Sequence, residues 1–387
     1  MTTTKSIDKQ YVLNTYNRFD LELVKGKGSL VYDESGTEYI DLTTGIGVTA
    51  FGIADEKWVE AVTNQLISLQ HVSNLYYTSP CALLAKAICE KTSMSKVFFS
   101  NSGAEANECA IKVARKYASD KGYDRYNILT LNNSFHGRTL ATLSATGQEH
   151  YHELFNPLPS GFVHADANDI DSVIRVAKEH NVCAIMMESV QGEGGVIPLE
   201  CDFVRAVDKF AKENDILLIF DEVQTGNGRT GKLYGYMNFS VTPDVFTTAK
   251  GLGEGLPIGA CVVGEKAQSV LGFGDHGSTY GGNPVACAGA LSVIERIDDE
   301  LLADVRKKSE YIFSELSNAD GVESISGMGL MIGIKTTKPV SDVIKECMQN
   351  GVLCLSAKDK LRLLPALNID FKLLKKAVEV IKSAVKN

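Results

Sequence analysis

Short apolar runs separated by amphipathic stretches occupy the middle of the chain, from Val97 to Ile219, and constrain the fold more than any other feature. The runs read VFFS, NILTL, CAIMME and ILLIF, and none of them alternates regularly with polar residues. Strands of this kind are buried on both faces, and the helices between them form the crossovers of a mostly parallel sheet. The sequence therefore predicts an α/β domain that covers roughly residues 50–280.

Different patterns flank this region. Residues 1 to about 15 are predicted to form a flexible arm, and Ser29 to Leu42 alternates around a glycine turn, as a hairpin does. Apolar residues at helical spacing follow Asp55 and Ser79, so a helical layer precedes the first buried strand. After residue 300, helices and short apolar runs mix without strict alternation, ending in a helix from Phe371 to Val385. This mixed order of helices and strands predicts a smaller α+β domain.

Composition excludes several classes of protein. The 387 residues carry a net charge of −9, which gives no overall basic field to attract nucleic acid. No stretch is apolar enough to span a membrane, and the polar N-terminus does not resemble a signal peptide. The nine cysteines are scattered without CxxC pairs, and the seven histidines form no metal-binding pattern. We therefore expect a cytoplasmic protein with no metal site, no nucleic-acid partner and no membrane contact.

Two charged residues stand at the ends of apolar runs. Asp221 follows the run 216–220, and Lys250 follows the run 245–249. Groups at the carboxyl ends of parallel strands point into one crevice, so both residues could face the same ligand. A lysine amine and a carboxylate are what pyridoxal phosphate (PLP) needs, for its aldehyde and its ring nitrogen respectively. Taken alone, each residue is better explained without a ligand, Asp221 as a turn cap and Lys250 as a solvated surface charge.

Three further motifs follow buried runs. SNSGAEAN, 100–107, opens a helix with small residues, which suits a phosphate site or merely a tight turn. In SFHGRT, Phe135 could stack on a flat ring and Arg138 could bind a carboxylate, or they could be a core residue and a surface charge. In MESVQGEGG, Glu188 and Glu193 flank a glycine-containing loop, where they could pair with an arginine or remain solvated.

Six motifs in one order resemble the class III (ornithine-type) aminotransferases, which are PLP enzymes of fold type I. They read NSGAEANE, SFHGRT, QGEGG, DEVQTGNGRTG, TTAKGLGEGLPIGA and GSTYGGNP, and the match extends from about Tyr16 to Arg362. SFHGRT and the compact length are most similar to the acetylornithine aminotransferase branch. The resemblance implies a large PLP-binding domain with a mostly parallel seven-stranded sheet and a smaller α+β domain. The implied division is 1–50 joining the small domain, 51–280 for the large domain and 281–387 for the C-terminal small domain.

The resemblance also assigns roles to the cofactor residues. Lys250 is expected to form the Schiff base with PLP, and Asp221 to pair with its ring nitrogen. The remaining expected cofactor contacts are the backbone of Ser102, Gly103 and Ala104 at the phosphate, Thr279 of a neighbouring subunit, Phe135 on the ring face, Gln224 near the ring hydroxyl, and Glu188. An active site shared in this way implies a homodimer.

Four residues are expected at the substrates. Arg138 is implied to bind the α-carboxylate of the amino donor and the distal carboxylate of glutamate, and Tyr16 to touch the donor. Arg362 is implied to bind the α-carboxylate of glutamate or 2-oxoglutarate, with Glu193 pairing with it while the donor is bound. Two positions depart from the family pattern: Ser189 and Ala366 stand where prolines are usual. We expect these departures to affect loop rigidity rather than activity.

The expected reaction moves the terminal amino group of N-acetylornithine to 2-oxoglutarate and gives N-acetylglutamate 5-semialdehyde and glutamate, as in arginine biosynthesis. Alternatives with the same chemistry are ornithine, succinylornithine, succinyl-diaminopimelate and 4-aminobutyrate aminotransferases. A nucleotide-binding oxidoreductase is the alternative of another class, but the chain lacks the GxGxxG spacing and the acidic residue that should follow it.

Overall fold

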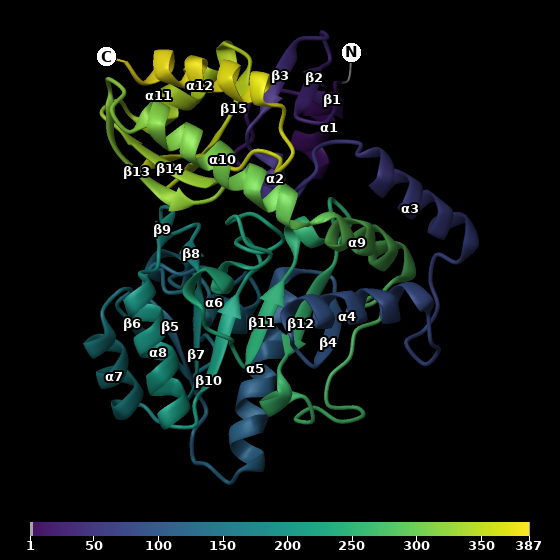
Figure 1. Cartoon of the computed structure of the whole chain (residues 1–387), viewed down its shortest axis with the longest axis vertical. Helices are drawn as coiled ribbons and strands as arrows, with labels where there is room; N and C mark the ends of the chain where they lie inside the picture. Colours follow the sequence, from purple (N-terminus) through teal and green to yellow (C-terminus); the bar gives the residue numbers. More distant parts are fainter. Residues whose placement is uncertain (1–2, 387) are drawn as a thin grey trace.

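The computed structural model describes residues 3–386, and a seven-stranded sheet forms its centre (Figure 1). The strand order is β4 (Lys96–Ser100), β12 (Gly259–Val263), β11 (Val245–Thr248), β10 (Leu217–Asp221), β7 (Val182–Glu188), β5 (Asn127–Leu131) and β6 (Phe162–Ala165). Neighbours from β11 to β6 pair in parallel, whereas β12 is antiparallel to both β11 and β4. The predicted mostly parallel sheet of seven strands is confirmed.

Helices cover both faces of this sheet. Helix α5 (Gly103–Asp120) packs on one face with Ile219 of β10, while Phe220, the next residue, joins the core of the opposite face. That opposite face is covered by α7 (Ile170–Glu179), α8 (Cys201–Glu213), α4 (Ser79–Thr92) and α9 (Pro284–Arg296), with α3 (Glu56–Ser68) packed on α9. Every residue of β7 and β10 is buried, which is why neither strand shows polar alternation in the sequence.

Two four-stranded sheets form the other end of the molecule (Figure 1). One contains β1 (Leu23–Lys27), β2 (Leu30–Asp33), β3 (Glu38–Asp41) and β15 (Val352–Leu353), and the other contains β13 (Val322–Met328), β14 (Met331–Thr336), β17 (Lys360–Leu363) and β16 (Leu355–Ala357). Helices α10 (Asp299–Leu316), α11 (Val340–Gln349) and α12 (Phe371–Val385) pack with them. Because β15 pairs in parallel with β3, the N-terminal and C-terminal segments share one sheet. The predicted division at residues 50 and 280 stays a prediction.

The remaining elements are short. They are α2 (Thr44–Gly47), α6 (Leu140–Ala145), β8 (Val190–Gln191), β9 (Ile197–Pro198), and the 3-10 turns η1 (Glu149–Tyr151), η2 (Gly235–Phe239), η3 (Lys250–Leu252) and η4 (Glu265–Ala267).

The expected flexible arm at residues 1–15 is wrong for its central part. Residues 4–11 form helix α1 (Thr4–Tyr11), and the Thr3 side chain accepts a hydrogen bond from the Ser6 N–H at its start. A reciprocal capping box of this kind satisfies free N–H groups and stabilises a helix that buries no residue of its own. Residues 1 and 2 lie outside the described residues.

Across residues 3–386, none of the helices combines the length and the apolar character that a membrane crossing requires.

Candidate active site

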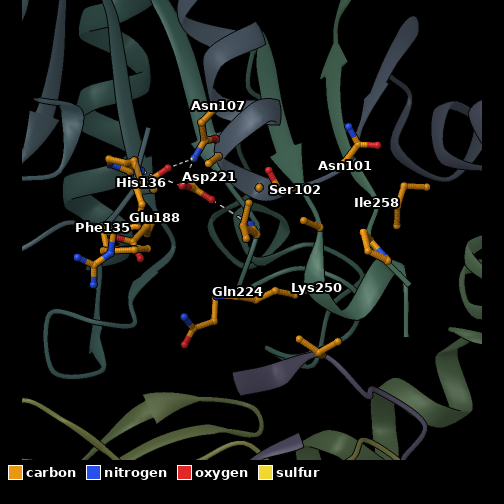
Figure 2. A pocket seen from close by; sticks show the side chains of 18 of the residues that line it. Asn101, Ser102, Asn107, Phe135, His136, Glu188, Asp221, Gln224, Lys250 and Ile258 are labelled. Carbon is orange, nitrogen blue, oxygen red and sulfur yellow. Dashed lines mark hydrogen bonds and ion pairs between the residues drawn. The ribbon is translucent and has the colours of Figure 1, made fainter. Parts of the chain in front are cut away.

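A cavity of about 600 Å³ lies at the carboxyl ends of the central strands. Its walls come from the segments that follow β4 and β5, from the last residues of β7 and β10, and from the turn after β11 (Figure 2). This is the place where open parallel sheets bind ligands, because loops from several neighbouring strands converge there.

Lys250 and Asp221 both line the cavity. Asp221 ends β10 and is in register with Thr247 of the neighbouring parallel strand β11, three residues before Lys250. The Lys250 backbone is in the left-handed region, with φ of 47°, a strained conformation for a side chain of this size and typical of functional sites. Burial lowers the pKa of the Lys250 amine, against the opposing charge of Glu193. A lowered pKa favours the neutral amine that acts as a nucleophile or base.

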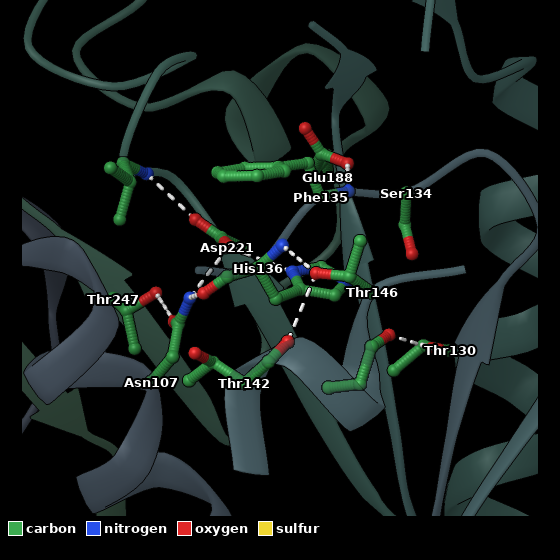
Figure 3. A network of polar contacts seen from close by, with 12 residues as sticks. Asn107, Thr130, Ser134, Phe135, His136, Thr142, Thr146, Glu188, Asp221 and Thr247 are labelled. Carbon is green, nitrogen blue, oxygen red and sulfur yellow. Dashed lines mark hydrogen bonds and ion pairs between the residues drawn. The ribbon is translucent and has the colours of Figure 1, made fainter. Parts of the chain in front are cut away.

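Three donors hold the Asp221 carboxylate in place (Figure 3). Its Oδ2 accepts from Asn107 Nδ2 at 2.8 Å and from His136 Nδ1 at 2.8 Å, and its Oδ1 accepts from the Val223 N–H at 3.0 Å. Donors of this number satisfy the hydrogen-bonding needs of a buried carboxylate and fix its direction. Although burial disfavours a charged imidazole, the hydrogen bond and charge of Asp221 raise the pKa of His136 above its usual value.

A second layer of contacts orients these donors. Thr247 Oγ1 donates to Asn107 Oδ1 at 2.6 Å, which directs the Asn107 amide nitrogen toward Asp221. The same nitrogen also donates to the His136 carbonyl at 2.7 Å, and the His136 N–H donates to Thr146 Oγ1 at 2.9 Å. Because β10, β11, α5 and the segment after β5 all contribute to this network, the direction of the carboxylate is determined by the packing around the sheet.

The N-terminus of α5 offers an anion site. Ser102 Oγ accepts from the Glu105 N–H at 3.2 Å, and the N–H groups of Gly103 and Ala104 find no acceptor among the described residues. Free N–H groups and the helix dipole both attract a phosphate. At Gly103, an added Cβ would lie 2.7 Å from Val223 Cγ1, so only glycine allows this close approach.

Phe135, Arg138 and Glu188 form another wall of the cavity. The Arg138 guanidinium lies 5.5 Å from the Phe135 ring centroid and 4.2 Å from that of Tyr151, which holds its planar group beside the two rings. Glu188 accepts hydrogen bonds from the N–H groups of Phe135, at 3.0 Å, and Gly192, at 3.2 Å. Burial raises the pKa of the Glu188 carboxyl to about 7.

An ion pair joins Glu193 and Arg362 next to the cavity. Arg362 Nη1 lies 2.5 Å from Glu193 Oε1, and Gln224, which lines the cavity, bonds to both partners at 3.3 Å and 3.2 Å. Although burial acts in the opposite direction, the Arg362 charge lowers the pKa of Glu193 below its usual value. The Arg362 guanidinium thus favours the ionised form of Glu193.

The structure brings together ten of the predicted site residues as cavity lining: Tyr16, Ser102, Gly103, Ala104, Phe135, Arg138, Glu188, Asp221, Gln224 and Lys250. Glu193 and Arg362 are not among the lining residues, but both bond to Gln224, which lines the cavity. Thr279 does not line it; this residue lies exposed in a loop beside Ser278 and Asn74. The roles given to these residues stay predictions.

Sequence reasoning missed four residues that support Asp221: Asn107, His136, Val223 and Thr247. Asn107 and His136 both lie within motifs noted in the sequence, SNSGAEAN and SFHGRT, but neither was given a role. A signal was available for Asn107, since it lies one turn into the helix that opens the phosphate motif. No local sequence pattern indicates that Thr247 would contact Asn107.

The two departures from the family pattern have different surroundings. Ser189 Oγ donates to Glu222 Oε1 at 2.7 Å, so the hydroxyl helps satisfy a buried carboxylate beside Asp221. Glu222 also accepts from Thr225 Oγ1 and from two backbone N–H groups, while burial raises its pKa to about 7. Ala366 is buried, and its carbonyl accepts from the Ile369 N–H at 3.1 Å.

The residues present fit the PLP that the sequence resemblance predicts. A buried amine, a fixed carboxylate and an aromatic ring surround the cavity, and the unpaired N–H groups of Gly103 and Ala104 suit its phosphate. Among residues 3–386 there is no group of three metal-ligating side chains.

Comparison with known proteins gives a consistent family assignment. The model of the family described as aminotransferase class-III matches residues 11–385. Acetylornithine aminotransferase of Haemophilus ducreyi is 48% identical over 97% of both chains. The solved N-acetylornithine aminotransferase of Stenotrophomonas maltophilia is 32% identical, with a TM-score of 0.85 over 98% of each chain.

A third relative matches mainly through its fold. Ornithine aminotransferase of Toxoplasma gondii, solved with partial occupancy of PLP at its active site, is 29% identical, with a TM-score of 0.94 over 100% of this chain and 95% of its own. These matches extend over nearly the whole chain, as does the predicted resemblance. The chain therefore belongs to the class-III aminotransferases, a family of PLP-dependent enzymes.

Proposed function

We propose that this enzyme transfers the terminal amino group of N-acetylornithine to 2-oxoglutarate, giving N-acetylglutamate 5-semialdehyde and glutamate. The names of its relatives support this substrate. The observation that carries the proposal is a pair of arginines with different surroundings. Arg138 faces the cavity and forms no salt bridge with any described residue, whereas Arg362 is paired with Glu193. This arrangement suits an enzyme that must bind one carboxylate of its donor and both carboxylates of its acceptor.

The residues of the chain divide the chemical work between them. PLP, when bound, supplies an electron sink for the carbon that carries the reacting amino group. Asp221, fixed by Asn107 and His136, would pair with the ring nitrogen of PLP, and a carboxylate partner favours the protonated nitrogen. The Lys250 Nζ, with its lowered pKa, would accept the proton from the substrate carbon and pass it to the carbon of the bound cofactor. A positioned base of this kind contributes about 10² to 10⁴ in rate.

The substrates are distinguished by the two arginines. Arg138 binds the α-carboxylate of the donor, which places the terminal amine near Lys250, and later binds the distal carboxylate of 2-oxoglutarate. Arg362 binds the α-carboxylate of 2-oxoglutarate once Glu193 moves away. While the donor is bound, Glu193 neutralises Arg362, because a buried cation without a partner is costly. Tyr16, exposed but at the cavity, is placed to contact the donor.

Kinetic comparison of donors tests this function. We expect the purified protein with PLP to absorb near the visible edge and to lose that band on addition of N-acetylornithine. Its kcat/KM for N-acetylornithine should exceed that for ornithine and 4-aminobutyrate by about 10² or more, because a site that pairs with a polar group discriminates against analogues that lack it. N-succinylornithine and N-succinyl-diaminopimelate serve as acyl variants. A higher kcat/KM for ornithine or 4-aminobutyrate would contradict the proposed donor.

We also propose a cytoplasmic homodimer with shared active sites. All nine cysteines are free, as expected for a reducing compartment. The loop that carries Thr279 is tied to the segment around Asn74, whose amide donates to the carbonyls of Ser278 and Gly281 at 2.9 Å and 2.8 Å. Exposed apolar side chains accompany these two segments: Leu75, Tyr76, Tyr77, Phe273 and Tyr280. Exposed apolar side chains of this kind are typical of interfaces, which supports the proposed dimer.

Sedimentation velocity and PLP titration test the shared site. We expect a dimer at micromolar concentration and about tenfold weaker PLP binding for Thr279→Ala, because one hydrogen bond to the phosphate is lost. The matched control is Thr337→Ala, at an exposed position directly after β14. The proposal would be contradicted if the wild type sedimented as a monomer and the Thr279→Ala variant bound PLP as tightly as the wild type.

A further inference from the structure

The loop from Asp221 to Gly231 contacts three parts of the site. Asp221 begins it at the end of β10, and Asn227 Nδ2 donates to the carbonyl of Ala249 at 3.1 Å, directly before Lys250. Gln224 bonds to Arg362. Further along, Arg229 Nη1 donates to the carbonyls of Leu330 and Pro365, beside the sheet that contains Arg362. One loop therefore connects the cofactor residues to the co-substrate arginine.

Arg229 is buried without a carboxylate partner. Its side chain is 2% exposed, and none of the salt bridges among residues 3–386 includes it. Instead, its Nη1 donates to two backbone carbonyls, of Leu330 at 3.2 Å and of Pro365 at 2.5 Å. A buried guanidinium is costly, so these bonds must compensate for its lost hydration. Burial lowers the pKa of Arg229 to about 10, which still leaves it charged at neutral pH.

The two carbonyls lie just outside the ends of two neighbouring strands. Leu330 directly precedes β14, and Pro365 follows β17 by two residues. In this antiparallel pair Ile332 is in register with Leu363, so both carbonyls lie at the same end of the sheet. The contact continues along the backbone, since the Leu330 N–H donates to the Arg229 carbonyl at 2.9 Å. An added Cβ at Gly329, where φ is +58°, would lie 2.4 Å from that carbonyl oxygen.

The segment after Arg362 has other anchors, but they come from elsewhere. Leu364 and Leu367 bond to Leu42 and Ala50 of the N-terminal segment, and Lys308 of α10 donates to the Leu367 carbonyl at 2.9 Å. Within the described part of the chain, Arg229 is thus a buried side chain through which the loop of Asp221 holds this segment.

We propose that Arg229 is a positioning residue that fixes Arg362 relative to the loop of Asp221 and Gln224, and so sets the affinity for the dicarboxylate co-substrate. The inference rests on the proposed function, in which Arg362 binds the α-carboxylate of 2-oxoglutarate. Arg229 itself contacts no substrate. Its loss should therefore weaken dicarboxylate recognition while leaving the donor, which relies on Arg138, little affected.

Binding and half-reactions test this role. The unreactive dicarboxylate glutarate is titrated calorimetrically into the PLP-loaded wild type, Arg229→Met and Arg175→Met, an exposed arginine on α7 that serves as control. The half-reactions with N-acetylornithine and with 2-oxoglutarate are then followed separately by absorbance. For Arg229→Met we expect glutarate affinity and the apparent affinity for 2-oxoglutarate to fall about tenfold, with the apparent affinity for N-acetylornithine changed less than about threefold. Arg175→Met should match the wild type.

The outcomes are distinguishable. Equal losses for donor and acceptor, or no loss for either, would overturn the positioning role. If Arg229→Met does not fold, Arg229→Lys, which keeps the charge but not the planar group, should show the same selective loss to a smaller extent. If the wild type binds glutarate but reacts with no N-acetylornithine, the proposed donor is wrong, and the glutarate comparison still decides the role of Arg229.

Discussion

Burial controls the ionisation of single carboxyl groups near the cavity, and Glu254 is the clearest case. It lies four residues after Lys250 and is 4% exposed. Its Oε1 accepts from the Phe51 N–H at 2.8 Å, whereas its Oε2 has no partner among the described residues. Burial raises the pKa of the Glu254 carboxyl from 4.5 to about 8. The folded protein thus holds a proton here that the unfolded chain releases.

This difference predicts a pH-dependent stability for Glu254→Gln. Between these two pKa values the folded state binds more protons than the unfolded state, so the stabilising effect of the protonated group is full at acid pH and is lost as pH rises through the folded pKa. Glutamine cannot ionise and escapes this loss. We expect the thermal midpoint of the variant, relative to wild type, to rise by a few degrees between about pH 5 and pH 8.5.

Differential scanning calorimetry at several pH values checks this prediction. Glu60→Gln, an exposed position on α3, serves as control and should show no such trend. A difference between Glu254→Gln and wild type that stays constant with pH would contradict the prediction.

At the scale of elements, the start of α5 depends on the strand end beside it. Gly103 begins the helix, and the Val223 side chain, two residues after Asp221, fills the space where a Cβ would lie. The phosphate site and the Asp221 carboxylate are therefore kept at a fixed separation by direct packing. A larger residue at 103 must displace one of them.

This contact predicts weaker cofactor binding for Gly103→Ala. Overpacking of this kind costs about 1–3 kcal/mol, so we expect PLP affinity to fall about tenfold when the protein without cofactor is titrated and followed by absorbance. The double variant Gly103→Ala with Val223→Ala removes the obstructing methyl groups and should recover most of the affinity. Wild-type affinity in the single variant would show that the helix start can shift freely.

Elements as such were largely predictable. Helix α12 has the predicted limits, and β7 and β10 lie within a residue or two of the apolar runs that indicated them. Helix α1 was missed because its stability comes from a capping box and not from an apolar face. No local sequence pattern predicts that β12 runs antiparallel to β11, because the direction of a strand depends on how it is connected to its neighbours.

At the scale of the whole molecule, the Glu193–Arg362 pair joins two sheets. Glu193 lies in the loop between β8 and β9, while Arg362 belongs to β17 and is 3% exposed. The same interface includes Lys360, which donates to Ser326 Oγ, and Ser326, which donates to the carbonyl of Val196 at 2.7 Å. Substrate recognition therefore depends on how the two parts of the molecule are packed together.

Removing the carboxylate should change the preference between substrates. In Glu193→Ala, Arg362 has no carboxylate partner while the donor is bound, whereas the α-carboxylate of glutamate still neutralises it. We expect the half-reaction with N-acetylornithine to slow about tenfold relative to that with glutamate, measured as kcat/KM by stopped-flow absorbance. Glu200→Ala, exposed at the start of α8, is the control. An unchanged ratio would mean that Glu193 does not act as a switch.

The sequence by itself determined the local part of this protein. Hydrophobic periodicity depends on near neighbours, so it indicated the buried strands, the covering helices and the placement of Asp221 and Lys250 at strand ends. The family resemblance also implied the pairing of Glu193 with Arg362. Only the tertiary structure decided which other side chains meet: His136 and Asn107 at Asp221, and Arg229 at the Pro365 carbonyl. The physical reason is that such contacts arise from the packing of segments distant in sequence, whose directions and distances are not encoded in any local pattern.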